Sequence, residues 1–226
     1  GTGLTQTVAD FFPEQKLSAS DSQPDHLFGC NVAIDGDTAL VGANYDDDNG
    51  SNSGSAYLYE RQADGSWSET QKLTASDGAT YDFFGLSVAI SGDTALVGAY
   101  FDDDNGADSG SAYIFQRQVD GSWSETAKLT ASDGEPSDRF GIKVDISGDT
   151  ALVGAQYGDG NEDNSGSAYL FQRQADGSWS ETAKLTASDG ASNDRFGYSV
   201  AISGDTALVG AYLDDDNGDS SGSAYL

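Results

Sequence analysis

The 226-residue sequence contains no methionine, and Cys30 is its only cysteine. A single cysteine excludes a disulfide bond within the chain and any metal site that needs two or more thiolates. Cys30 falls on the first predicted strand of its repeat, and we expect it to be a small buried apolar residue. Because no methionine stands at position 1, we also expect the chain to be part of a longer product.

Basic residues are scarce as well. Ten Lys and Arg stand against 38 Asp and Glu, which gives a formal net charge of −28. The ten cations are scattered singly, whereas nucleic-acid binding needs clustered cations that displace counterions from phosphates. No apolar stretch approaches the roughly 20 residues of a membrane helix. The sequence therefore predicts no nucleic-acid partner and no insertion into a membrane.

The sequence repeats with a period of 56 residues, marked by Phe-Gly pairs that begin at Phe28, Phe84, Phe140 and Phe196. The motif WSET begins at Trp67, Trp123 and Trp179, and one period before Trp67 lies Phe11, in the divergent segment FFPEQKL. That segment is a displaced copy of the same strand. We therefore predict a single domain, 1–226, with an outer strand in 1–20 and repeats at about 21–76, 77–132, 133–188 and 189–226.

Each repeat contains four short segments without a helical period, which read FGYSVAIS, TALVGA, SAYLFQRQ and WSETAKLT. The dipeptide Asp176-Gly177 between the last two is typical of a hairpin turn. Four consecutive antiparallel strands make one propeller blade. The sequence thus predicts an all-β fold, a β-propeller of four four-stranded antiparallel blades, with the first two strands inside and the fourth at the outer edge.

An arginine closes the third strand of three repeats, and a glutamate stands in the fourth strand of each. These residues are Arg61, Arg117 and Arg173, with Glu69, Glu125 and Glu181. We expect them to form cross-strand ion pairs worth about 0.2–1 kcal/mol each.

The two ends of the chain complement each other. The sequence opens with an outer strand and stops at Leu226, inside a third strand. We expect residues 11–18 to complete the blade left unfinished at 222–226, which would remove two exposed sheet edges. Three arrangements fit these ends. The ring closes within one chain, the chain is a piece of a larger array of blades, or the opening strand completes the last blade of a neighbouring subunit, which is self-association by strand exchange.

Acidic residues concentrate in the loop between the second and third strands. This loop and the one that leads into the next repeat should emerge on the same side of each blade, because antiparallel strands alternate in direction. Carboxylate oxygens suit calcium, which accepts six to eight of them, although the spacing is not that of an EF-hand loop. The alternative is a solvated acidic surface that attracts cations diffusely, as in halophilic proteins. The candidate metal ligands are Asp46, Asp47, Asp48, Asp102, Asp103, Asp104, Asp159, Asp214, Asp215 and Asp216.

The segment FGYSVAISGDTALVGA resembles the FG-GAP repeats of integrin-alpha-like β-propellers, and more closely those of bacterial relatives with a W…KLTASDG segment between repeats. The resemblance implies propeller blades on a secreted or surface protein that serves adhesion or ligand binding. The proline of the family's GAP element is replaced by Asn44, Tyr100, Gln156 and Tyr212. The family's calcium loop between the first two strands is missing, so its ligands cannot be transferred to any residue here.

These features predict an extracellular or cell-surface structural or adhesive repeat protein that mediates protein interaction or self-assembly, with an acidic cation-binding face and calcium as the candidate cofactor. The alternative is a carbohydrate-binding propeller in which Trp67, Trp123 and Trp179 stack on sugars. We expect these tryptophans to pack between blades instead. We do not expect an enzyme, because catalysis needs distinct residues with separated pKa values, and here nearly every acid recurs in equivalent copies.

Overall fold

The computed structural model describes residues 14–226, which form only β-strands and their connections. The strands build four antiparallel sheets, with the orders β1-β2-β3-β4, β5-β6-β7-β8, β9-β10-β11-β12 and β13-β14-β15. No helix that could span a membrane occurs in this part of the chain. The strands are β1 Val32–Asp35, β2 Thr38–Ala43, β3 Ser55–Arg61, β4 Trp67–Leu73, β5 Ser87–Ser91, β6 Thr94–Ala99, β7 Ser111–Arg117, β8 Trp123–Leu129, β9 Phe140–Ser147, β10 Thr150–Ala155, β11 Ser167–Arg173, β12 Trp179–Leu185, β13 Phe196–Ser203, β14 Thr206–Ala211 and β15 Ser223–Tyr225.

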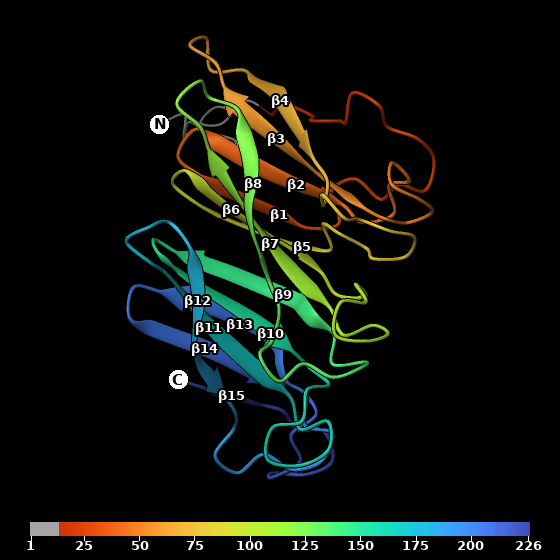
Figure 1. Ribbon diagram of the computed structural model, residues 1–226, viewed down its shortest axis with the longest axis vertical. Helices are drawn as coiled ribbons and strands as arrows, with labels where there is room; N and C mark the ends of the chain where they lie inside the picture. The colour runs from red at the N-terminus through yellow and green to blue at the C-terminus, as the bar shows by residue number, and fades with distance from the viewer. Residues whose placement is uncertain (1–13) are drawn as a thin grey trace, which may run out of the picture.

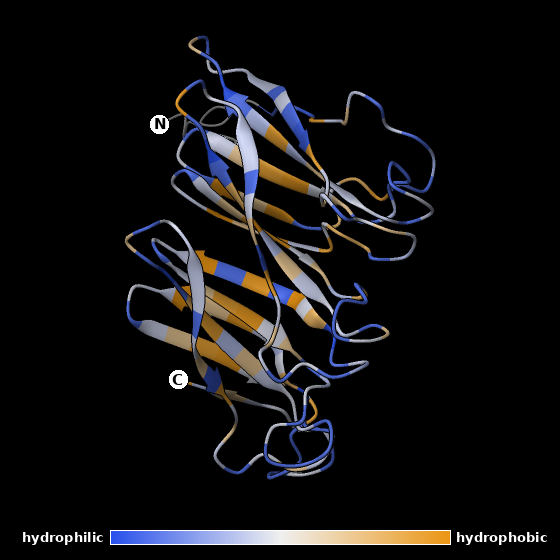
Figure 2. Ribbon diagram, in the orientation of Figure 1, coloured by the Kyte–Doolittle hydropathy of each residue, from blue (hydrophilic) through white to orange (hydrophobic). Residues whose placement is uncertain are grey.

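One antiparallel sheet per repeat confirms the predicted blade organisation. The sheets follow one another from β1–β4 at the top of Figure 1 to β13–β15 toward the bottom. Their faces pack together through apolar side chains, such as Leu40 and Leu58 of the first sheet against Phe84 and Val97 of the second. Figure 2 shows hydrophobic residues concentrated in the strands and hydrophilic ones in the loops. Every residue of β2 and of β6 is buried, as predicted for inner strands.

Glycines in the second strands set how closely two sheets approach. A Cβ built on Gly98 of β6 would lie 2.0 Å from the carbonyl oxygen of Gly141, in the next sheet. Gly42 and Gly154 meet the Gly85 and Gly197 oxygens in the same way. The sheets therefore pack backbone against backbone at these points, where no side chain fits.

The described part of the opening segment, residues 14–20, does not join the last sheet. Residues 11–13 of the predicted outer strand lie outside the described residues, and the remainder contacts the first sheet. The Gln15 side chain exchanges hydrogen bonds with the backbone of Trp67, at 2.7 Å in each direction. Within residues 14–226, β15 of the last sheet pairs only with β14. Residues 14–20 therefore do not complete the last sheet of their own chain, which lies at the other end of the stack (Figure 1). This alternative of the prediction is corrected, and completion of a neighbouring subunit's last sheet stays a prediction.

The two end sheets expose residues that the repeats bury elsewhere. Val32 and Ile34 on β1 are 67% and 66% exposed, whereas the equivalent Val88 and Ile90 on β5 are 5% and 9% exposed. Leu208 on β14 is 42% exposed, and its counterparts in the other three sheets are fully buried. Both ends of the described stack therefore present an uncovered sheet face.

Cys30 lies two residues before β1 of the first sheet. It is exposed rather than buried, so the expectation for this residue was wrong. Its thiol donates to the main-chain oxygen of Gly85, in the second repeat, at 3.4 Å. The equivalent residue of the third repeat, Ile142, is buried.

The predicted Arg–Glu pairs do not form. Each third strand is joined to its fourth with a register shift, for example between Leu58 and Tyr59, so that Arg61 lies opposite Trp67. Glu69 instead accepts hydrogen bonds from the backbone N–H and the hydroxyl of Ser20, at 2.8 and 2.7 Å. The glutamates therefore join successive units and leave the hairpin arginines to other partners.

Candidate functional site

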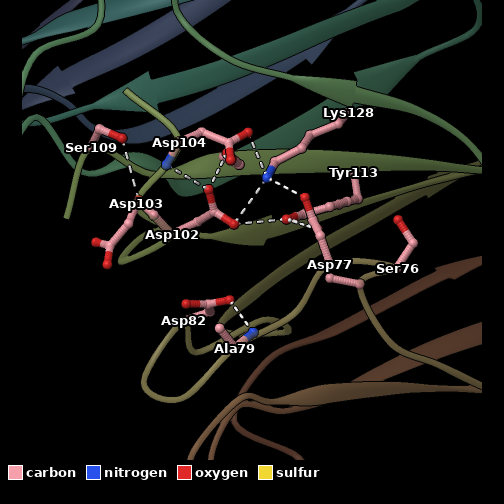
Figure 3. Close-up of polar contacts among 12 residues, drawn as sticks. Ser76, Asp77, Ala79, Asp82, Asp102, Asp103, Asp104, Ser109, Tyr113 and Lys128 are labelled. Atoms are coloured by element: carbon pink, nitrogen blue, oxygen red, sulfur yellow. Dashed lines mark hydrogen bonds and ion pairs between the residues drawn. The ribbon is translucent and has the colours of Figure 1, made fainter. Parts of the chain in front are cut away.

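A cluster of three aspartates closes around one lysine in the second sheet (Figure 3). Asp102 and Asp104 come from the loop between β6 and β7, and Asp77 comes from the loop between β4 and β5. The Lys128 ammonium, carried by β8, lies 2.7 Å from Asp77, 3.1 Å from Asp102 and 2.6 Å from Asp104. The Tyr113 hydroxyl of β7 donates to both Asp77 and Asp102, at 2.8 and 2.9 Å. The two kinds of loop thus converge, as the alternating strand directions predicted.

The first sheet repeats this arrangement. Lys72 of β4 lies 2.7 Å from Asp21 and 3.1 Å from Asp46, and it also pairs with Asp48. Tyr57 donates to Asp21 and Asp46, at 2.7 and 2.8 Å. Two consecutive repeats therefore place a lysine ammonium among three carboxylates.

The third sheet keeps only part of the cluster. Gly158 and Gly160 replace the two loop aspartates that would contact the lysine. Lys184 still pairs with Asp133 at 2.7 Å, and it donates to the main-chain oxygen of Asp159 at 2.9 Å. The lysine thus keeps its position when a carbonyl takes the place of a carboxylate.

The last sheet has the aspartates but no lysine among the described residues. Asp189, Asp214 and Asp216 each offer an oxygen within 4.8 Å of the others. Tyr225 donates to Asp189 and Asp214, at 3.0 and 2.7 Å. The repulsion from Asp214 and Asp189 raises the pKa of Asp216. The cluster therefore lacks the cation that balances its counterparts.

The loop aspartates have two different tasks. The first and third of each Asp-Asp-Asp run join the clusters, namely Asp46, Asp48, Asp102, Asp104, Asp214 and Asp216. The middle ones do not: Asp47 and Asp103 accept backbone N–H groups of Asn52 and Asp108 within their own loops, and Asp215 is exposed. Asp159 likewise accepts the N–H of Asn164 through its carboxylate. The middle residues stabilise the loop conformation.

Sequence reasoning missed part of the site. Asp21, Asp77 and Asp189, from the loops that lead into the repeats, were not among the predicted metal ligands, and neither were the lysines and tyrosines. All of them recur at the 56-residue period, Lys72, Lys128 and Lys184 among them. A basic residue that recurs in an otherwise acidic chain was the available signal.

Charge and hydrogen bonding favour the ionised forms of Asp77 and Lys128. Burial by itself would raise the pKa of Asp77, but hydrogen bonds from Lys128 and Tyr113 lower it. Burial would lower the pKa of Lys128, but its aspartate partners raise it. Burial and the neighbouring carboxylates together raise the pKa of Tyr113, so its hydroxyl stays a donor.

The first two clusters fit an ammonium group rather than an added metal ion. Three carboxylates suit a hard cation such as calcium, but the lysine nitrogen already lies within 3.1 Å of all three in the second sheet. A metal ion there would have to displace the side chain. Of the three aspartate clusters in residues 14–226, the last one alone has no lysine from this part of the chain at its centre.

Near the second-sheet cluster, the pKa of Asp82 is raised rather than lowered. Burial raises the pKa of Asp82 to about 6, against an ordinary value of 3.8, and the charges of Asp102 and Asp103 add to this. The folded chain therefore holds the proton more tightly than the unfolded chain between about pH 4 and 6, so this group's contribution to stability falls as pH rises through that window.

We expect Asp82→Asn to remove the loss of stability that ionisation of Asp82 causes as pH rises. Asparagine is uncharged and can still accept the Ala79 N–H that Asp82 binds at 2.6 Å. The variant should be more stable than the wild type at pH 7, and this difference should shrink toward pH 4. Denaturant unfolding across this range measures it, with Asp120→Asn in an exposed hairpin as control, where hydrogen bonds from Ser122 lower the pKa instead. A stability curve for Asp82→Asn that runs parallel to the wild-type curve would contradict the assignment.

The three tryptophans pack against core residues. Trp123 is buried in the core cluster between the first two sheets. Trp67 and Trp179 are half-buried, and each packs against a neighbouring cluster of buried apolar residues. Their positions agree with the expected packing between blades.

Comparisons with known proteins agree with the repeat organisation. A family model described as FG-GAP repeat matches residues 11–59, 67–115, 123–171 and 179–226. Among solved structures, the chain is similar to the crystal structure of the Saccharomyces cerevisiae Sqt1, with a TM-score of 0.51 and 12% identity. That match covers 86% of this chain and 45% of the Sqt1 chain, and at this identity it shows the fold alone. A search of curated proteins gives no match.

Proposed function

The chain belongs to the FG-GAP repeat family, and we propose that it is a structural interaction module, outside the cell or on its surface, that associates end to end with further copies. The observation that carries this proposal is the exposure of Val32 and Ile34 at one end and of Leu208 at the other. The equivalent residues inside the stack are buried, because a neighbouring sheet covers them. A neighbouring copy would cover the exposed end residues in the same way.

The proposal accounts for the charge of the chain as well. A net charge of −28 disfavours nonspecific contact between copies. Specific association then requires surfaces that fit, and the two end sheets fit because the repeats inside the chain already pack on each other in that order. We infer no catalytic role, because the Lys–Asp clusters recur from sheet to sheet rather than setting one acid apart.

We propose calcium binding for only one kind of aspartate cluster, the kind without a lysine. In the first two sheets a lysine ammonium takes the central position, so we propose that these clusters function without metal. A divalent cation is expected only where the lysine is absent.

Sedimentation velocity across a dilution series tests the association. We expect the wild-type chain to form oligomers that dissociate on dilution. Ile34→Asp should weaken association by about a hundredfold or more, because it places a charge in an apolar contact. Val119→Asp is the matched control, since Val119 lies in an exposed hairpin away from the end faces. A wild-type chain that stays monomeric at every concentration would refute the proposal.

A further inference from the structure

We propose, building on the end-to-end association above, that the opening segment of a second copy forms the outer strand of the last sheet, and that its Lys16 enters the cluster of Asp189, Asp214 and Asp216. The partner is another copy of this chain. The segment concerned is residues 14–20, and the edge that receives it is β15.

The repeat register assigns Lys16 to this position. Lys16 lies 56 residues before Lys72, and Lys72 lies 56 before Lys128. In the first two sheets the lysine at this position of the outer strand fills the aspartate cluster. Lys16 itself is exposed and forms no ion pair with any residue in 14–226. Within residues 14–226, Lys16 therefore has the repeat position of a cluster lysine but no aspartate cluster around it.

The opening segment already makes the contacts of an outer strand toward the sheet that follows it. Gln15 binds the N–H and the carbonyl of Trp67, at 2.7 Å each. Gln71 of β4 binds Trp123 in the same way, at 2.8 and 2.6 Å. The segment thus occupies the place of an outer strand whose three inner strands are not found within residues 14–226.

Another contact repeats in the same manner. Ser20 donates to Glu69 from its N–H and its hydroxyl, at 2.8 and 2.7 Å, and Ser76 donates to Glu125 at 2.9 and 2.8 Å. Because the contacts with the following sheet are already formed, an arriving copy has to supply only the inner three strands of a sheet.

The last sheet presents those three strands. In the other sheets, β3, β7 and β11 each pair with a fourth strand on the side that β15 leaves unpaired. The aspartate cluster beside β15 is arranged as in the second sheet, since Tyr225 donates to two aspartates as Tyr113 does. Only the ammonium group is missing, and the opening segment brings one.

The end faces add matching hydrogen bonds. Between the second and third sheets, the Ser87 and Ser91 hydroxyls accept the N–H groups of Val144 and Gly148, at 3.0 and 3.1 Å. The equivalent hydroxyls of the last sheet are those of Ser199 and Ser203. By the same repeat they would accept the N–H groups of Val32 and Gly36 in the second copy. Strand, lysine and sheet face therefore select the same partner in the same orientation.

This contact is heterologous, because it joins the last sheet of one copy to the opening segment and first sheet of another. Such contacts form rings when the rotation closes and fibres when it does not. Either product contains the proposed junction, and electron microscopy of the particles distinguishes them.

A double-mutant cycle between Lys16 and Asp216 tests the junction. Lys16→Met should weaken association by about thirtyfold or more, because it leaves the aspartate cluster unpaired in a closed interface. Asp216→Asn added to Lys16→Met should recover part of this loss, since one of the repelling charges is gone. The control Lys143→Met removes the same charge from β9 and should change association less than about threefold.

The readouts separate the two proposals. Sedimentation gives the association constants, and amide hydrogen exchange of Ala224–Leu226 should slow on association of the wild type, because β15 gains a partner strand. Circular dichroism confirms that Lys16→Met remains folded, which we expect because Lys16 is exposed. If Lys16→Met associates as the wild type does and β15 exchanges unchanged, this junction is wrong while end-to-end association stands.

Discussion

Gly98→Ala is expected to destabilise the fold by about 4 kcal/mol or more, beyond the 1–3 kcal/mol typical of an overpacked core. The added Cβ would lie 2.0 Å from the Gly141 oxygen and 3.0 Å from its carbonyl carbon. The obstacle is backbone, so no side-chain rotation relieves it. The second and third sheets would have to separate, which opens the core cluster that Leu96 and Val144 share. Denaturant unfolding of the variant measures the loss.

Gly210→Ala is the matched control for this prediction. Gly210 stands in the same TALVGA sequence, in the last sheet, where a Cβ would meet only the Ser199 hydroxyl at 2.5 Å. That hydroxyl can rotate away, so we expect a cost below about 1 kcal/mol in dilute, unassociated protein. Equal losses in the two variants would show that the strand itself rejects alanine, and that sheet approach is not the cause.

The fold was predictable from the sequence because the same strand and turn motifs recur from repeat to repeat. The segment TALVGA occurs four times with the same neighbours, and each copy forms a buried inner strand or its end-sheet equivalent. Alternation and the Asp-Gly turn fixed the strand order within a unit. The convergence of two kinds of loop followed from strand direction alone.

Contacts between units were harder to predict, because they depend on register and on what lies at each end. The shift between Leu58 and Tyr59 moves Glu69 away from Arg61, and no pattern in the sequence marks that shift. Cys30 was expected to be buried, since its repeat equivalents are apolar, but it precedes β1 and is exposed. The middle aspartates, such as Asp103, were grouped with their neighbours because sequence spacing does not show which way each side chain turns.

Lys128→Met is expected to destabilise the chain by about 3 kcal/mol at pH 7. Removing one partner of a buried ion pair typically costs about 3–5 kcal/mol, and the lower figure applies because the side chains of Asp77 and Asp104 are about half exposed to water. Asp102 is buried and loses its only lysine partner. Arg61→Met is the matched control: it removes the same charge from an exposed pair with Asp37 and should cost less than about 1 kcal/mol.

The effect of Lys128→Met should depend on pH and on calcium in a defined direction. Without the ammonium, the pKa values of the cluster aspartates rise, so the folded variant binds protons that the folded wild type does not, and the penalty shrinks as pH falls toward 4. Calcium can enter the emptied cluster and should raise the melting temperature of the variant beyond a control of equal ionic strength. It should not do so for the same cluster in the wild type, where Lys128 occupies the central position. Because the last cluster also lacks a lysine among the described residues, the comparison is made in an Asp214→Asn background. Equal calcium stabilisation of both proteins in that background would mean that the lysine does not take the place of a metal ion.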